Sequence, residues 1–509
     1  MDVSGHVFRS GRLISRRGVV RRSIGLVVLA VPGLLVACGR VAPQAQAPSL
    51  SAAPSSSVAS VPAASTPAAT ITSAVSTAAS AASSSAATPS AAGSAPATTG
   101  SLLIWHGWGT TGGGVAMVDQ VAAFKQAHPG FTIEVVTNAN VQKLVAAIAG
   151  SNPPDVMQLN QGDVATLAMK QALMPLDASF AQDHIDMAGF WPVCTQIVSF
   201  LGKRYGMPHH QGCYVLFWNR SLFQQAGLDP EKAPATWSDI TNASAKLIKQ
   251  QGDQYTQLGF VPTLIQTSWS LTSFISDGLA VLSPEGRRVA FETAAAISAL
   301  NWNLQVFAQY QGGYNGWNTW YNKVKTTLPS SGPPPQTLYT RSQLALLWWG
   351  NWLFNGIQTL SPDLPWGVAA LPQGPESSAP PVAQAGGGAL LAIPTGAKHV
   401  SAGWQFLAFE GSADGQYLVQ KNSSDVAALI AAAEDPRIVG AKLGRQQVLP
   451  LFKSAVVGAT IDSPISGDLN PLVSTMENDV LTGKQSANDA LHSAATTMNA
   501  KLADYYKSV

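Results

Sequence analysis

The chain has 509 residues, of which 46% are hydrophobic and 11% are charged, with a formal net charge of +2. Soluble chains usually carry roughly 25% charged residues, so this protein presents an unusually neutral surface. The length allows roughly two to four domains of about 150 residues each. The basic excess falls within residues 9–40, and no basic stripe remains beyond them. Nucleic-acid binding is therefore not expected, because phosphate neutralisation needs clustered lysine and arginine.

Residues 1–37 predict an export signal that ends at a lipid-modified cysteine. Arginines cluster between Arg9 and Arg22, and an apolar run over 24–37 follows them. That run is too short to span a hydrocarbon core of about 30 Å, and it fits a secretory signal instead. It ends in Leu-Val-Ala before Cys38, which resembles the lipobox of bacterial lipoproteins, where lipid is added to the cysteine sulfur. A signal peptide with a chance cysteine is the alternative.

Residues 38–100 are interpreted as the lipidated cysteine and a disordered tether. Ala, Ser, Pro and Thr dominate this tract, which has almost no charge and no aromatic residue after its first positions. Such a composition cannot bury enough apolar surface to offset the entropy of ordering, so we expect a spacer between membrane and globular part. Upstream, residues 15–20 resemble a twin-arginine export signal, but Val19 replaces the usual phenylalanine and the export route stays open.

From Ser101 the pattern changes to alternating strands and helices. Alternation and apolar runs predict strands over 102–106, 131–136 and 154–159, and helical spacing predicts helices over 117–128 and 141–149. This order indicates an α/β fold with a largely parallel sheet. Ligands of such sheets bind beyond the carboxyl ends of the strands, so the loops after Trp105 and Leu159 are candidate sites.

The order and spacing of several segments resemble the family 1 extracellular solute-binding proteins, the maltose-binding-protein-like class that serves ABC importers. The block over 204–247 is the most specific part, and the resemblance extends over nearly all of 101–509. The segments that carry it are LLIWHGWG at 102–109, FKQAHPG at 124–130, PPDVMQLNQGD at 153–163, ALMPLDA at 172–178, RYGMPHHQGCYVLFWNRSLFQQAGLD at 204–229, APATWSDITNASAKL at 233–247, LALLWWGNWLF at 344–354 and GGGALLAIPTGAKHVSAGWQFLAF at 386–409.

The resemblance implies a two-lobe periplasmic-binding-protein-like fold of class II. Each lobe would be a sheet flanked by helices, with a ligand cleft between lobes that close by hinge motion. The crossing segments are expected near 209–214 and 385–389. The expected lobes are 101–211 with 388–448, and 212–387 with 449–509.

Sugar binding needs aromatic planes for C–H faces and planar polar groups for O–H edges. Trp349, Asn351 and Trp352 offer both in one loop, and the resemblance places Trp352 where a sugar-stacking tryptophan usually lies. The alternatives are core packing for the tryptophans, a helix cap for Asp163 and a simple hinge for Gly387. The full predicted ligand-binding set is His106, Trp108, Gln161, Asp163, His209, His210, Trp269, Trp349, Asn351, Trp352 and Gly387.

We expect no metal, no cofactor and no catalysis. His209 and His210 are adjacent and should point in different directions, and no further ligand residues stand near them. No loop pair of carboxylates, nucleophile elbow, zinc-protease motif or P-loop is found in the sequence. Outside the cytoplasm Cys194 and Cys213 can form a disulfide or remain two buried thiols, and both readings stay open.

The sequence therefore predicts an extracytoplasmic substrate-binding lipoprotein, held at the cell membrane through Cys38. It would bind a sugar or oligosaccharide as a monomer and deliver it to the transmembrane subunits of an ABC permease. A phosphate ligand would need arginine, and Arg204 is the one arginine near the candidate loops, so a neutral solute is favoured. Glycerol-3-phosphate, a nucleoside, a sensing role, an exported glycan-active enzyme and a surface adhesion protein remain the alternatives.

Overall fold

The computed structural model describes residues 99–109, 113–265, 267–329, 332–375, 377, 381–457 and 463–507. All of these belong to one of the two units into which the chain divides, namely Ala86–Val509. The expected signal segment, Cys38 and nearly all of the tether lie outside the described residues, so the lipid anchor stays a prediction. Among the described residues, no helix has the length and apolar character that crossing a membrane requires.

The main sheet has eleven strands among the described residues, and its central path has the order β2-β1-β3-β11-β6-β9-β8-β7. Strands β10 and β12 pair with β6, β13 pairs with β11, and β4 and β5 form a separate hairpin. The strands are β1 (Thr99–Trp105), β2 (Gly130–Val136), β3 (Val156–Asn160), β4 (Ser199–Phe200), β5 (Lys203–Arg204), β6 (Gly206–Asn219), β7 (Lys249–Gln251), β8 (Gln254–Phe260), β9 (Leu344–Gly350), β10 (Trp366–Ala369), β11 (Gln384–Ala392), β12 (Val426–Ala427) and β13 (Val456–Val457).

Strands β1, β2 and β3 lie where the sequence pattern predicts them and pair in parallel, as expected. The expectation of a largely parallel sheet is nevertheless wrong. Strand β6 runs antiparallel to β11, β9, β10 and β12, so the centre of the sheet is antiparallel. The reason is that β6 and β11 are two long strands that run in opposite directions and pair with each other at the centre of the sheet.

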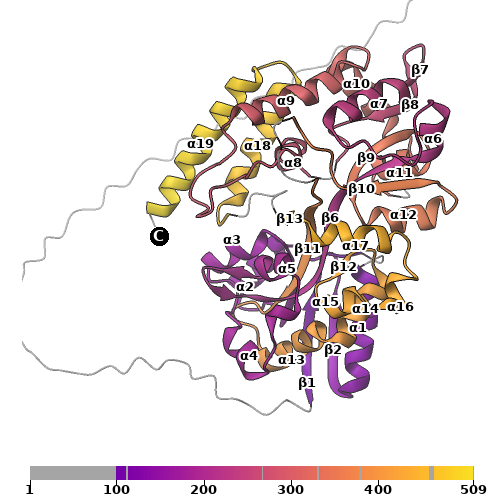
Figure 1. The fold of residues 1–509 in the computed structure, drawn as a ribbon. Helices are drawn as coiled ribbons and strands as arrows, with labels where there is room; N and C mark the ends of the chain where they lie inside the picture. The colour runs from indigo at the N-terminus through magenta and orange to yellow at the C-terminus, as the bar shows by residue number, and fades with distance from the viewer. Residues whose placement is uncertain are drawn as a thin grey trace, which may run out of the picture. The chain divides into compact units, whose positions relative to one another are not determined.

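Strands β6 and β11 join two groups of elements, one around β1–β3 and one around β7–β9 (Figure 1). All 14 residues of β6 are buried; its first half pairs with β11, and its second half with β9 and β10. The predicted lobe limits at 211/212 and 387/388 fall within these two strands. Both limits remain predictions.

Helices cover each group of strands. Helices α1–α5 and α13–α15 accompany the first group and α6–α12 the second, where α18 packs against α19 (Figure 1). The helices are α1 (Gly113–Ala127), α2 (Val141–Ala149), α3 (Asp163–Met169), α4 (Asp177–Gln182), α5 (Pro192–Ile197), α6 (Arg220–Gln225), α7 (Trp237–Leu247), α8 (Trp269–Ser276), α9 (Ala294–Phe307), α10 (Gly313–Val324), α11 (Pro334–Thr340), α12 (Leu353–Leu360), α13 (Val400–Gly411), α14 (Ala413–Asn422), α15 (Ile430–Ala433), α16 (Pro436–Val439), α17 (Arg445–Lys453), α18 (Ser466–Leu481) and α19 (Ala487–Lys507), with a 3₁₀ turn at Met187–Gly189.

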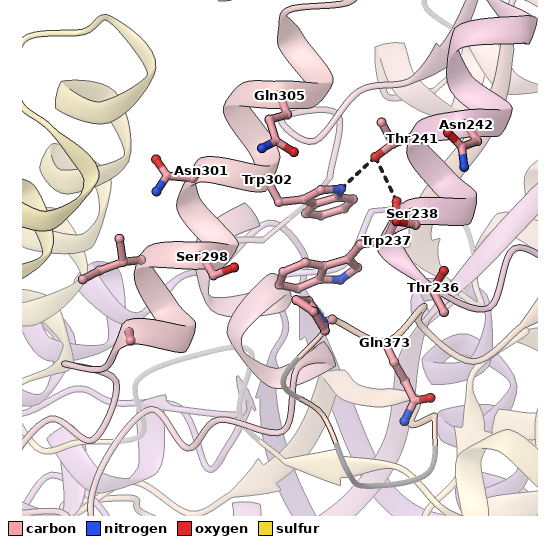
Figure 2. A pocket seen from close by; sticks show the side chains of 14 residues that line it. Thr236, Trp237, Ser238, Thr241, Asn242, Ser298, Asn301, Trp302, Gln305 and Gln373 are labelled. Atoms are coloured by element: carbon pink, nitrogen blue, oxygen red, sulfur yellow. Dashed lines mark hydrogen bonds between the residues drawn. The ribbon is translucent and has the colours of Figure 1, made fainter.

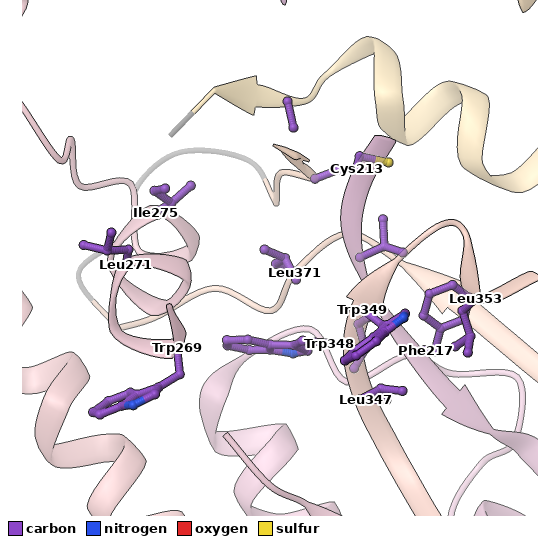
Figure 3. Close-up of a cluster of buried hydrophobic side chains, with 14 of the residues drawn as sticks. Cys213, Phe217, Trp269, Leu271, Ile275, Leu347, Trp348, Trp349, Leu353 and Leu371 are labelled. Atoms are coloured by element: carbon purple, nitrogen blue, oxygen red, sulfur yellow. The ribbon is translucent and has the colours of Figure 1, made fainter. Parts of the chain in front are cut away.

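Tryptophan side chains fill much of the core of the second group. Trp237 on α7 and Trp302 on α9 stack with ring centroids 4.6 Å apart (Figure 2). Trp348 on β9 continues this packing towards Trp302 at 5.7 Å, and Trp349 and Trp269 lie in the same buried cluster (Figure 3). Much of the tryptophan content of this chain therefore stabilises the core.

Candidate functional site

Three glycines from three neighbouring strands lie beneath the indole ring of Trp352. Gly212 lies on β6, Gly350 on β9, and Gly387 on β11, where its φ is +72°. A Cβ atom added to Gly350 would come within 2.1–2.2 Å of three carbon atoms of that ring. The same atom on Gly212 or Gly387 would come within 2.8 or 2.7 Å of it. No side chain fits between strands and ring, and we call these three residues the glycine bed.

The Trp352 ring is held at its edge as well as from beneath. Tyr214 on β6 lies edge-on to it, with ring centroids 5.3 Å apart and planes at 78°. A Cβ on Gly386 would come within 2.3 Å of the Tyr214 ring, so this glycine makes room for the tyrosine. Trp352 is half-buried, so part of its ring remains open to solvent. The arrangement is a fixed aromatic platform.

Two glutamines meet above Gly388, the next residue after the glycine bed on β11. Gln211 Nε2 donates to Gln161 Oε1 at 2.9 Å, and the backbone N–H of Gly388 donates to the same oxygen at 3.3 Å. A Cβ on Gly388 would come within 2.0 Å of Gln211 Oε1. That oxygen is buried and receives no hydrogen bond from the described residues, and a ligand hydroxyl is a donor of the kind it lacks.

Trp108, which follows β1, packs against three imidazole rings. Its ring centroid lies 4.9 Å from that of His209, and 5.6 Å from those of His210 and His106. The three histidines are buried, whereas Trp108 is half-buried. The carboxyl end of β1 and the middle of β6 thus meet at Trp108, which brings together four residues that the sequence predicted for the site.

The two adjacent histidines do not point apart as expected. His209 Nδ1 lies 2.7 Å from His210 Nδ1, so one imidazole donates a hydrogen bond to the other. The two Nδ1 atoms can meet because Nδ1 is the ring nitrogen nearer the backbone, where the side chains of adjacent residues are closest. Among the described residues no group of three or more His, Cys, Asp or Glu side chains could hold a metal ion.

A chain of buried polar side chains supports the histidine pair from behind. Gln120 on α1 places its Oε1 3.1 Å from His209 Nε2 and donates from Nε2 to the Glu410 carboxyl group on α13. Glu410 Oε2 lies 3.6 Å from His209 Nε2, and at the other end His210 Nε2 lies 3.8 Å from Asp425 Oδ2. Residues from two helices and one loop therefore fix the two imidazole rings.

Burial favours the uncharged forms of these side chains. Removal from water lowers the pKa of His209 well below its usual value, and His210 and His106 lower it further. Burial also lowers the pKa of His210, against the opposing effect of Asp425 and the Gly387 carbonyl. Burial raises the pKa of Glu410 well above its usual range. Neutral imidazoles next to a protonated carboxyl group follow from these directions.

Asn351 and Asp163 are engaged within the protein. Asn351 Oδ1 accepts from the backbone N–H of Cys213 at 2.8 Å, and its Nδ2 donates to the Ser424 carbonyl at 2.5 Å. Asp163, the first residue of α3, accepts from the backbone N–H of Asn160 at 2.8 Å. Asn351 therefore braces β6 against the segment before β12, and Asp163 closes the turn between β3 and α3.

Trp269 and Trp349 lie in the core of the second group of elements (Figure 3). Trp349 is on β9, whose residues are all buried, and only 2% of its surface is exposed. Trp269 begins α8, a helix in which all eight residues are buried, although several of its neighbours in the sequence are polar. Both rings pack against apolar side chains, so neither offers an open face like that of Trp352.

The two remaining cysteines are free thiols. Cys194 and Cys213 are both buried and unpaired. Burial raises the pKa of Cys213 to about 12 and that of Cys194 further still, so neither is a reactive thiolate at neutral pH. Of the two readings of this pair, the structure supports two buried thiols.

Several residues of this region were not predicted from the sequence. The glycines Gly212 and Gly350, the amides Gln211 and Gln120, and Glu410 carry no motif of their own. A signal did exist for two of them, because Gly212 lies within strand β6 and Gly350 ends the apolar strand β9, and a glycine in a strand often marks a close approach.

The sequence profile of the family described as "Bacterial extracellular solute-binding protein" matches residues 107–417, more than half of the chain. This chain belongs to that family. The family resemblance predicted from the sequence is therefore confirmed.

Curated relatives match over shorter stretches. The sn-glycerol-3-phosphate-binding periplasmic protein UgpB of Yersinia pestis bv. Antiqua (strain Antiqua) is 30% identical over 139 residues, 26% of this chain and 32% of that protein. UgpB of Shigella flexneri serotype 5b (strain 8401) is 32% identical over 165 residues, 30% of this chain and 37% of that protein. The chain thus spans about a third of the length of these relatives.

Solved structures match over most of the chain. CpMnBP1 with mannobiose bound is 22% identical with a TM-score of 0.65, covering 78% of this chain and 98% of that one. The GacH receptor of Streptomyces glaucescens GLA.O has 20% identity and a TM-score of 0.64, covering 80% and 99%. UgpB from Mycobacterium tuberculosis in complex with glycerophosphocholine has 18% identity and a TM-score of 0.65, covering 80% and 99%. The predicted two-lobe periplasmic-binding-protein-like fold is therefore confirmed.

Proposed function

We propose that this protein is the extracytoplasmic solute-binding subunit of an ABC importer and that it binds a neutral sugar or oligosaccharide at Trp352. The observation that carries the proposal is the indole platform on the glycine bed, with Gln211 of β6 and Gln161, which follows β3, meeting beside it at Gly388 of β11. A rigid aromatic plane next to planar amides suits a ligand with C–H faces and O–H edges.

The charge of the site favours a neutral ligand. Arg445 lies near the platform, but it is buried and donates to the backbone carbonyls of Ser424 and Asp425 at 3.1 and 2.7 Å. Its Nη2 is thereby bound within the protein, while its Nη1 is buried without a hydrogen-bond partner among the described residues. Binding a phosphate needs arginine or several aimed N–H groups. The relatives named for glycerol-3-phosphate nevertheless make that ligand the second candidate.

Of the predicted site residues, the proposal keeps a subset. Trp352 supplies the platform, Gln161 the amide edge and Gly387 part of the bed, while Trp108 stands over His209 and His210 as a second half-buried aromatic ring. His106 supports Trp108 from within. Asp163 and Asn351 shape the backbone of the site, and the buried rings of Trp269 and Trp349 take no part.

Thermal unfolding of the full chain with Cys38→Ser tests the ligand class. Ligand at 100 times its dissociation constant adds about 2.7 kcal/mol to the free energy of unfolding. A rise in melting temperature with maltotriose or mannotriose, and none with glycerol-3-phosphate, supports the neutral-sugar proposal. A rise with glycerol-3-phosphate alone replaces it with the second candidate, and unchanged sugar after prolonged incubation supports binding without catalysis.

Delivery to a permease and attachment through lipid on Cys38 are part of the same proposal. They rest on the family and on the lipobox-like end of the apolar run over 24–37. Mass spectrometry of the membrane fraction tests the anchor, because lipidation and cleavage would leave a mature chain that begins at a modified Cys38. An unmodified chain in the culture medium would refute it.

A further inference from the structure

Two grooves flank helix α7, one lined by charged side chains and the other by uncharged ones. One has a volume of 180 Å³ and is lined by four charged side chains, those of Asp229, Lys232, Asp239 and Lys246. The other has a volume of 790 Å³ and lies between α7 and α9, and none of its described lining residues carries a charge. We call the second one the amide groove.

Its two walls carry uncharged polar side chains. Ser238 and Asn242 come from α7, and Ser298, Asn301 and Gln305 come from α9 (Figure 2). The three α9 residues follow at helical spacing, so they share one face of the helix. None of these five side chains makes a hydrogen bond within the described part of the protein, and all but the half-buried Ser298 are exposed.

The floor of the groove is formed by two tryptophan rings that are held in a fixed orientation. Trp237 and Trp302 stack there at 4.6 Å with planes 12° apart. The indole N–H of Trp237 donates to Ser276 Oγ at 3.2 Å, and that of Trp302 donates to Thr241 Oγ1 at 2.9 Å. With both polar atoms engaged, only carbon edges of the rings face the groove.

The absence of charge is not a general property of exposed helices here. Helix α9 has 14 residues and no Asp, Glu, Lys or Arg, whereas α19 carries Asp489, Lys501, Asp504 and Lys507. Solvent-exposed helix faces normally carry charges that keep the protein soluble. The exposed face of α9 instead carries Ser298, Asn301 and Gln305 beside the edges of two tryptophan rings. Such a face suits the binding of uncharged polar groups.

We propose that the amide groove is a second carbohydrate-binding site, separate from the Trp352 platform and selective for neutral glycans. Amides and hydroxyls both donate and accept hydrogen bonds, as sugar hydroxyls do, so two facing walls of such groups can engage both edges of a chain. The apolar floor meets the C–H groups between those edges. The volume falls within the range of about 300–1,000 Å³ that is typical of small-molecule sites.

Counting bound sugar tests this site independently of the proposed transport function. The full chain with Cys38→Ser is titrated with mannotriose and maltotriose by equilibrium dialysis, and a second equivalent of at least one sugar is expected. The double variant Asn301→Ala with Gln305→Ala should lose that equivalent, with about tenfold weaker binding in the groove and unchanged affinity at the platform. The control pair Gln224→Ala with Gln225→Ala removes two exposed amides from α6 and should change nothing.

Trp352→Ala separates the two sites. If the groove binds sugar, this variant retains one equivalent, and saturation-transfer NMR of mannotriose shows contact that disappears when Asn301→Ala and Gln305→Ala are added. Complete loss of sugar binding in Trp352→Ala overturns the groove while leaving the platform in place. Retention of both equivalents in the α9 double variant also overturns it.

Discussion

The Trp352 platform and the amide groove, both of which we propose to bind sugar, are built in opposite ways. At the platform, the indole ring is fixed by three glycines and by Tyr214 before any ligand arrives. In the groove, only the floor is fixed, and the amide side chains of α9 make no bonds within the described part of the chain.

This difference predicts different affinities. Ordering a free, rotamer-rich side chain on binding costs about 0.5–1.5 kcal/mol, so two or three unrestrained amides weaken the groove against the platform. At the platform, the entropy of the Trp352 side chain is already lost on folding, because strands far apart in sequence fix the ring. A tight primary site and a weaker second site follow, and the changes below test each part of that contrast.

The largest expected effect is on the free energy of unfolding, through the buried polar side chains that support His209. Glu410→Ala removes the carboxyl group that Gln120 and His209 contact and opens a cavity, so the free energy of unfolding should fall by about 2–4 kcal/mol. Glu410→Gln retains a hydrogen-bonding group of the same size and should cost much less. Urea unfolding of both variants checks this, and equal losses would contradict the role assigned to the protonated carboxyl group.

Trp352→Ala should weaken sugar binding by about 1–3 kcal/mol, the scale of a lost stacking contact. Because the ring is half-buried over glycines, we expect little change in the melting temperature without ligand. Calorimetric titration and thermal unfolding measure the two quantities. A sharp fall in melting temperature with no change in affinity would move Trp352 from the site to the core.

Gly350→Ala should weaken sugar binding by about 1–2 kcal/mol through displacement of the platform ring. In the Trp352→Ala background the same change should have no further effect on affinity, because the displaced ring is gone. Gly467→Ala is the matched control, since an added Cβ meets nothing within 4 Å there. Additive losses in the double variant would show that Gly350 acts on something other than Trp352.

The smallest effect concerns pH. The folded-state pKa values of His209 and His210 are lowered by burial, so their contribution to stability is complete above about pH 6.5 and is lost as pH falls below it. Glu410 acts in the opposite sense: its pKa is raised, so its contribution is complete at acidic pH and declines as pH rises. Between pH 7.5 and 5.5 the two effects oppose each other, because an unfolded imidazole of usual pKa gains its proton there whereas an unfolded glutamate of usual pKa stays ionised.

We therefore expect a fall in the free energy of unfolding of about 1 kcal/mol from pH 7.5 to 5.5 in the Glu410→Gln variant, which lacks the opposing carboxyl group. A His209→Gln variant that still folds should lose part of this slope. Chemical denaturation at three pH values measures it. A stability that rises towards pH 5.5 would contradict the buried neutral state of the pair.

Local patterns were enough to predict the first strands and helices. The run over 102–106 and the alternation over 131–136 correspond to β1 and β2, because their apolar residues fill one sheet face. The centre of the sheet was not predictable in this way, since strand direction between β6 and β11 depends on how two distant segments cross. Trp269 was misjudged because its polar neighbours are serines and threonines that α8 buries and bonds internally.

The sequence by itself determined the family, and it predicted the export signal, the tether and Trp352 as a binding residue, because these depend on the order and composition of residues along the chain. Only the tertiary structure decided which tryptophans stay open to solvent. Trp349 and Trp352 are three residues apart, yet one lies inside strand β9 and the other over glycines contributed by three strands. Burial and close approach are properties of packing between distant segments, which local sequence does not encode.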